Sequence, residues 1–258
     1  MFGPGSMTWR VNGEAVLLLG GGRALILQVA HPKVAAGVGE FSNFRKDPWR
    51  RLYRTLDTTL TIVFGDPGRS RAASERLRNV HERVTGRDDR GERYRALDPE
   101  LLLWVQATLI DTSLTVYERY VAPLTSNERD RYYEEMKLVG EAYAIPRDVM
   151  PADYRAFRNY YSRMLAGGLR VTETARDVAD AVLRPGLPRV AWPAIELLRL
   201  VTVGTLPPHL RGELGLAWGP GRERVLAGSQ AAVSRLLPAL PALLHRFPQA
   251  RTGMLRAA

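Results

Sequence analysis

The chain has 258 residues, 45% of them hydrophobic, which is enough apolar material for one sizeable core. It contains no cysteine, and this excludes disulfides, thiolate catalysis and zinc or iron–sulfur sites built on sulfur. The formal net charge is +10, but most basic residues alternate with acids, a pattern typical of solvated helix faces, so we expect no nucleic-acid binding.

The hydrophobic residues are never grouped into a long uninterrupted run. The longest candidate, AVLLLGGGRALILQVA, is broken by three glycines and an arginine, so we expect no transmembrane segment. The first residues, MFGPGSMTWRVNGE, lack the layout of an export signal, and we expect a soluble, cytoplasmic protein. Two small domains would fit this length, but the absence of a convincing linker favours one domain over residues 1–258.

Apolar residues recur at helical spacing along the first half of the chain, which predicts an all-α fold. A small-residue-rich helix over 13–30 is expected to bend at Gly20–Gly22, before Pro32 redirects the chain. Asp47-Pro48 opens a helix through about Phe64, and Asp66-Pro67 opens another that ends at Gly86.

The second half begins with a polar segment, 86–96, which we predict to be an exposed loop. Asp98-Pro99 then starts the longest apolar helix, to about Tyr120, and Ser126 is expected to cap the next one. Further helices are predicted at about 151–166, 172–184 and 192–203. A last helical stretch, 220–246, is broken at Pro238 and Pro241.

The glycine triplet 20–22 suggests a phosphate loop, but the lysine and hydroxyl of that motif are missing, as is the strand before it. Close packing between helices explains the triplet better. No serine, histidine and carboxylate stand in a persuasive arrangement for a hydrolase, so that class is set aside.

The four histidines are the main candidates for chemistry. His209 and His245 lie in the C-terminal third, and we expect them to be surface or capping residues. His31 precedes a proline at a helix break, where its side chain can be held against a cavity wall.

His81 lies in the segment RNVHERVTG, and Leu77, Val80 and Val84 share or border its helical face. A hydrogen-bonded core histidine is one interpretation of this pattern, and a metal ligand is the other. If His81 is a ligand, a single imidazole suits haem better than zinc, because the porphyrin supplies four further donors.

A polar stripe lies in DPWRRLYRTLDTT, where Arg51, Arg54, Thr55 and Thr58 recur at three- and four-residue spacing. The stripe is either a solvated helix edge or a polar wall that faces haem and donates hydrogen bonds to propionates or bound oxygen.

Taken together and in order, GGGRALILQVAHPKVAAGVGEFSNF, DPWRRLYRT, FGDP, RNVHERV, YRALDPELLLWVQATLIDTSLTVYERYVAPL and YYEEMKLVGEAYAIP resemble the family of MpaB-type oxygenases and latex clearing proteins. The resemblance covers about residues 1–220. It implies an all-helical fold with a core similar to globins, bound haem b, and the use of dioxygen.

The resemblance also implies roles for individual residues. His81 matches the proximal haem ligand, and Arg51 and Thr55 match the R-x-x-x-T element on the distal side. Arg54 stands where latex clearing proteins have a lysine that can cap the iron, and arginine is a poor ligand. Gln106 stands where the family often has histidine. Glu40 is the candidate for the distal base, and His31 is a second candidate at the cofactor.

The sequence therefore predicts a haem b-dependent oxygenase that acts with dioxygen on a small to medium, apolar organic molecule. The resemblance does not extend to polyisoprene as the substrate. A non-catalytic haem- or lipid-binding protein is the alternative, and a basic helical scaffold is a third class. The oligomeric state stays open, with a homodimer among the alternatives.

Overall fold

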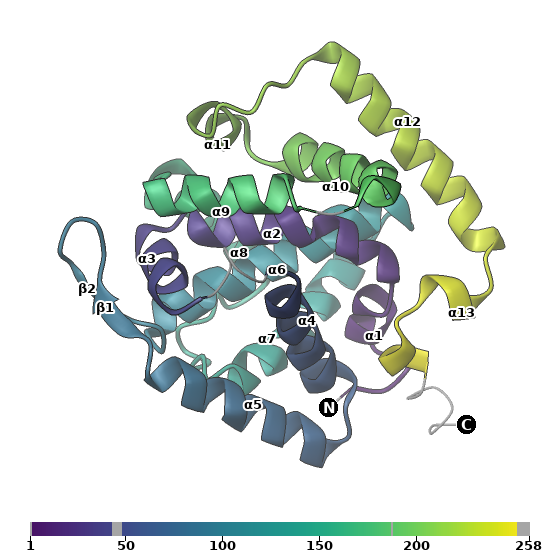
Figure 1. Ribbon diagram of the computed structural model, residues 1–258. Coiled ribbons are helices and arrows are strands. Elements are labelled where there is room, and N and C mark those ends of the chain that lie inside the picture. The colour runs from purple at the N-terminus through teal and green to yellow at the C-terminus, as the bar shows by residue number, and fades with distance from the viewer. Residues whose placement is uncertain (1, 43–47, 187, 252–258) are drawn as a thin grey trace.

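The computed structural model describes residues 2–42, 48–186 and 188–251, and its description leaves out the side chains of residues 48–54, 189 and 242. Helices make up most of these residues, and the prediction of an all-α fold is confirmed (Figure 1). The first half contains α1 (Met7–Asn12), η1 (Ala15–Gly20), α2 (Gly21–Val29), α3 (Pro32–Phe41), α4 (Pro48–Phe64), α5 (Pro67–Glu82), α6 (Pro99–Tyr120) and α7 (Ser126–Ala142).

The second half is helical in shorter pieces, with breaks at the predicted Pro238 and Pro241. It contains α8 (Tyr154–Arg163), η2 (Met164–Gly168), α9 (Glu173–Leu183), η3 (Arg189–Ala191), α10 (Trp192–Thr205), α11 (Pro208–Glu213), α12 (Pro220–Leu236), η4 (Leu237–Ala239) and α13 (Ala242–His245).

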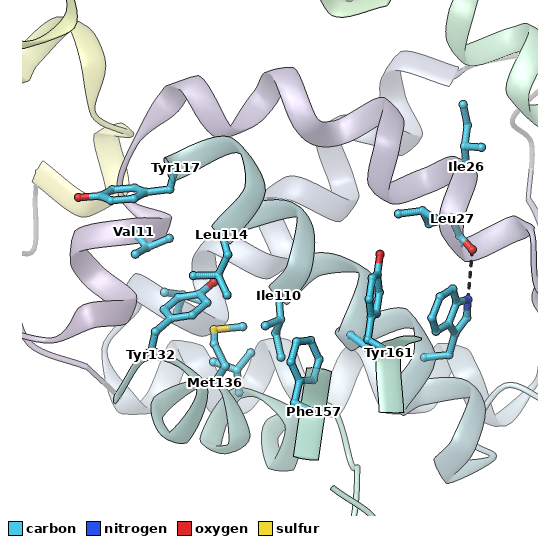
Figure 2. Packing of buried hydrophobic residues seen from close by; sticks show 14 of the residues in the cluster. Val11, Ile26, Leu27, Ile110, Leu114, Tyr117, Tyr132, Met136, Phe157 and Tyr161 are labelled. Atoms are coloured by element: carbon cyan, nitrogen blue, oxygen red, sulfur yellow. Dashed lines mark hydrogen bonds between the residues drawn. The ribbon is translucent and has the colours of Figure 1, made fainter. Parts of the chain in front are cut away.

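The long apolar helix α6 lies at the centre of the molecule, packed against α1, η1, α2, α7 and α12. Most of its side chains are buried because neighbours cover it on several sides. Figure 2 shows Ile110 and Leu114 of α6 close to Met136 and Tyr132 of α7. The indole nitrogen of Trp104 donates to the Leu27 carbonyl at 3.1 Å, which fixes α6 against α2.

The helix starts follow the capping signals of the sequence. Asp66 accepts a hydrogen bond from the Arg69 amide at 2.9 Å, and Asp98 accepts one from the Glu100 amide at 3.0 Å. The predicted cap of α7 was wrong by one residue. The Thr125 hydroxyl, and not that of Ser126, accepts a hydrogen bond from the Glu128 amide. The Glu128 carboxylate accepts one from the Thr125 amide, and the two bonds form a capping box.

The glycine triplet lets α2 and η1 approach α6 and α10 closely. A Cβ at Gly20 would lie 2.5 Å from Thr112 Cγ2 and 2.9 Å from Val116 Cγ2, and one at Gly22 would collide with Thr202. The space beside Gly21 is open. The close-packing interpretation of the triplet is thus confirmed, and η1 gives way to α2 within it.

A buried ionic network ties α2 to α6, α8 and α10. Arg23 donates to the Asp111 carboxylate and the Thr112 hydroxyl, each at 2.6 Å, and to the Thr205 carbonyl at 3.0 Å. Arg158 pairs with the other oxygen of Asp111. Because every charge here has a partner, the network can stay in the core.

The segment 86–96 differs from the prediction. It is a β-hairpin, in which β1 (Thr85–Arg87) pairs antiparallel with β2 (Arg93–Arg95). Lys33 of α3 contacts Glu92 in the turn at 3.0 Å, and Tyr94 is buried. These contacts with α3 hold the segment in a regular pair of strands that its polar composition did not predict.

The two ends of the described chain meet on one side of the molecule (Figure 1). Glu14, which is buried, accepts from His245 Nδ1 at 2.8 Å and pairs with Arg246 at 3.3 Å. His245 is therefore a partner of a buried carboxylate, which corrects the expectation of a surface residue. His209 is exposed, as predicted.

No single helix in the described part of the chain has the length and apolar character needed to cross a membrane. One pair, Ala15–Val29 with Pro32–Phe41, passes the test of length and hydropathy only when taken together, and the two segments are bent by 107°.

Candidate active site

Helix α5 places His81 in its last turn, on the side that faces the body of the protein. Ser70 and Ala73 are buried on this side. Leu77 and His81 follow at four-residue spacing on the same side and are half-buried. The Ser70 hydroxyl donates to the Ile62 carbonyl at 2.9 Å, which fixes the start of α5 against α4. Leu77 thus shares the face of His81 as predicted, but Val80 is 55% exposed and does not.

The His81 imidazole is suited to be a ligand. Burial lowers its pKa, so the ring is neutral at neutral pH, and a neutral ring keeps a lone pair that can bind a metal. Neither ring nitrogen has a hydrogen-bond partner among the residues that the structure describes. His81 is half-buried, and its ring nitrogens are not among the fully buried atoms without a partner, so both interpretations of this residue, structural and ligand, stay predictions.

The β-hairpin that follows His81 connects α5 to α3. Tyr94 of β2 donates from its hydroxyl to Glu40 Oε2 of α3 at 2.9 Å. Burial, together with the Glu40 carboxylate, raises the pKa of Tyr94 to about 12. A Cβ at Gly86 would lie 2.7 Å from both of these oxygens, so the missing side chain leaves room for the pair of Tyr94 and Glu40. Glu40 is itself exposed and its carboxylate is held by the hairpin.

His31 lies at the other end of α3, as the residue before its first turn. Its Nδ1 is buried and has no hydrogen-bond partner in the described ranges. Burial, and then the positive charge of Lys33, lower the pKa of this imidazole. Since Lys33 and Glu40 both contact the hairpin, the elements that carry His31, Glu40 and His81 meet at one hairpin.

The polar stripe of α4 is only partly described. The helix runs without a break from Pro48 to Phe64, so residues 51, 55 and 58 follow one face. The side chains of Arg51 and Arg54 lie outside the described residues. Thr55 is exposed and Thr58 half-buried, and the next residue, Thr59, lies 3.5 Å from the hydroxyl of Tyr143.

Gln106 lies in the contact between α6 and α7. Its Nε2 donates to the Met136 carbonyl at 2.6 Å, and its Oε1 would be 2.5 Å from a Cβ at Gly140. The side chain is buried and its amide is used for helix packing. Gln106 therefore has a structural role in this chain.

Among the described residues, the alternatives to this site are a metal-ion site and a pocket away from His81. No three His, Asp or Glu side chains in residues 2–42, 48–186 and 188–251 are grouped to hold a bare metal ion. A pocket of about 860 Å³ lies between α9, α10 and α12, and none of the candidate residues lines it. A porphyrin requires only one ligand from the protein, so a haem site needs no such group of side chains.

Sequence reasoning missed Tyr94 and Lys33, the two residues that join α3 to the hairpin. The alternation of exposed and buried residues in RYR is a strand signal, but three residues are too few to detect it. The acidic turn before it, with Asp88 and Asp89, also looked like part of a solvated loop.

Residues 9–236 match the family described as ER-bound oxygenase mpaB/B′ and rubber oxygenase, catalytic domain. The chain belongs to this family. The resemblance found in its motifs is thereby confirmed, and the family is one of oxygenases.

Two mycobacterial proteins are similar to this member of the family. An uncharacterized protein of Mycobacterium tuberculosis and one of Mycobacterium bovis are each 30% identical over 208 residues, or 78% of this chain and 80% of theirs. No solved structure matches the chain.

Proposed function

We propose that the protein is a haem b-dependent oxygenase that acts with dioxygen on a small to medium, apolar organic substrate. The single observation that carries this proposal is the His81 imidazole: neutral through burial, unpartnered among the described residues, and held on the inner face of α5. Membership of an oxygenase family supports the reaction class. Haem, when bound, supplies an iron centre that binds and activates dioxygen.

His81 would hold the group, and the apolar residues of the neighbouring helices would shield it. Leu56 of α4, Leu77 of α5, and Val34 and Val38 of α3 are partly buried and pack against the main core. Such side chains exclude water and favour an uncharged imidazole. The same apolar surroundings favour an apolar substrate.

The remaining candidates would donate hydrogen bonds or accept a proton at the site. Arg51 and Arg54 are permanently charged and would donate hydrogen bonds to propionates or orient oxygen, with Thr55 adding a hydroxyl on the same face of α4. Glu40 would be the base, and the hydrogen bond from the Tyr94 hydroxyl would hold its carboxylate in position. We base these proposed roles on the resemblance to the family motifs and on the positions of the residues in α3 and α4.

The test is the absorbance spectrum of purified protein titrated with haem. The wild type should develop a Soret band at one haem per chain, and His81→Ala should lose it while keeping the far-ultraviolet circular dichroism of the wild type. His209→Ala is the matched control, because His209 is exposed on α11, and it should keep the band.

Two outcomes would contradict the proposal. A wild type that develops no Soret band would remove the haem cofactor altogether. A His81→Ala variant that keeps the band while His31→Ala loses it would move the ligand to α3. Oxygen consumption with alkenes then separates an oxygenase from a non-catalytic haem protein.

A further inference from the structure

The C-terminal part of the chain exposes an unusual number of large apolar side chains. Leu243 and Leu244 are 67% and 65% exposed, and Leu236 is 65% exposed. We define the C-terminal apolar patch by its members, which are Val190, Trp192, Leu236, Leu240, Leu243 and Leu244. Leu240, Leu243 and Leu244 lie beyond residue 236, where the match to the oxygenase family ends.

The packing of α12 on α10 brings the two parts of the patch to one end of the helix pair. Gly204, late in α10, faces Leu226, early in α12, where an added Cβ would lie 2.5 Å from the leucine side chain. Leu197, earlier in α10, and Val233, later in α12, pack on the same apolar cluster. The helices therefore run in opposite directions, and Trp192 lies at the end where Leu236 closes α12. Figure 1 shows α12 on the outside of the molecule, leading into α13.

The charges around the patch are mainly positive, with the exposed Glu196 of α10 as an acidic neighbour of Trp192. From Arg224 to the last residue the sequence contains five arginines and no aspartate or glutamate. Arg235 is exposed and adjacent to Leu236, whereas Arg224 lies at the opposite end of α12 and Arg246 is paired with Glu14. Exposed leucine and tryptophan beside arginine, in a segment with few acidic residues, is the composition of segments that lie in the interface of an anionic bilayer.

We propose that the C-terminal apolar patch docks the protein on an anionic phospholipid surface. The apolar side chains would enter the boundary between headgroups and acyl chains, and Arg235 would contact lipid phosphates. A second copy of the chain fits less well, because a two-fold contact would bring the arginines of one patch against those of the other. This docking is independent of the haem site, since the patch and α5 share no residue.

Vesicle sedimentation tests the proposal with the full chain. The wild type should sediment with vesicles of equal parts phosphatidylglycerol and phosphatidylcholine, and release at high salt should be substantial. It should bind vesicles of pure phosphatidylcholine at least about tenfold more weakly, because each arginine contributes through the anionic charge of the surface.

Two sets of variants identify the surface. The triple variant Leu236→Ser, Leu243→Ser, Leu244→Ser should bind anionic vesicles at least about tenfold more weakly, because it removes three exposed apolar side chains. Arg235→Glu should reduce binding several-fold. The matched controls are Leu138→Ser on α7, where the leucine is 38% exposed, and Arg71→Glu on α5; both should bind as the wild type does.

The result that overturns the proposal is a wild type that stays in the supernatant with anionic vesicles, or a triple variant that sediments as well as the wild type. Light scattering after size exclusion tests whether a second copy of the chain covers the patch. A stable wild-type dimer that the triple variant converts to monomer would assign the patch to self-association and reject the lipid surface. Unchanged thermal unfolding of the variants shows that folding is not the cause.

Discussion

At the scale of single residues, His31 and His81 have similar electrostatics but different surroundings. Burial lowers the pKa of both imidazoles. His31 faces additional charges: Lys33 lowers its pKa further, whereas Asp98 and Asp88 raise it. Its Nδ1 is enclosed without a partner among the described residues, so protonation of this ring would place a charge where the protein does not solvate it.

His31 should therefore make stability depend on pH. Its pKa is lower in the folded than in the unfolded protein, so the unfolded state binds more protons just below the ordinary histidine pKa of about 6.5. The contribution is fully present above that pKa and is lost as the pH falls. We expect the free energy of unfolding of haem-free protein, measured with urea, to fall from about pH 7.5 to 5.5.

The variant His31→Gln should make this decline shallower, because glutamine does not titrate, and His81, whose pKa burial also lowers, should account for part of what remains. His209→Gln, at an exposed position, should leave the slope of the wild type unchanged. If His31→Gln and the wild type lose stability in parallel, the protons that destabilise the protein bind elsewhere.

The sequence predicted some of the candidate site because helical spacing is a local property. The position of His81 beside Leu77 follows from four residues of one helix, and the structure bears it out. The bond between Tyr94 and Glu40 joins residues 54 positions apart, and no local pattern encodes it. The roles of Arg51, Arg54 and Thr55 stay predictions.

At the scale of elements, the glycine triplet provides an internal comparison. Gly20→Ala should lower the free energy of unfolding by about 1–3 kcal/mol, because its methyl group would press on Thr112 and Val116 of α6. Gly21→Ala should raise it by about 0.5 kcal/mol, since Gly21 has helical φ and ψ of −56° and −42° and open space beside it. Urea unfolding of the two variants measures both effects, and equal changes would contradict the packing model.

The elements were largely predictable wherever a capping residue and a proline coincide. Asp66-Pro67 and Asp98-Pro99 fixed the starts of α5 and α6, because the side chain satisfies a free amide and proline has none to satisfy. The hairpin was not predictable in the same way. Its strands of three residues are too short to show a period of two, and contacts with α3 stabilise it.

At the scale of the whole molecule, the chain closes on itself through Glu14. This carboxylate is buried between the first helices and the C-terminal segment, and it contacts both His245 and Arg246. The Phe247 amide also donates to the Gly13 carbonyl at 2.9 Å. Partners more than 230 positions apart cannot be inferred from local sequence. For this reason His245 was expected at the surface, although it stabilises the contact between the two ends.

Breaking this contact should loosen the C-terminal segment before the rest of the protein. Glu14→Ala removes a buried carboxylate that accepts one hydrogen bond and forms one ion pair, and it should lower the free energy of unfolding by about 1–3 kcal/mol. Hydrogen exchange followed by mass spectrometry should show faster exchange in residues 242–251 and unchanged exchange in α6, since the core helix does not depend on Glu14. Glu75→Ala, at an exposed position on α5, is the control and should change neither region. Unchanged exchange in residues 242–251 of Glu14→Ala would mean that Phe247 and its neighbours hold the segment without the carboxylate.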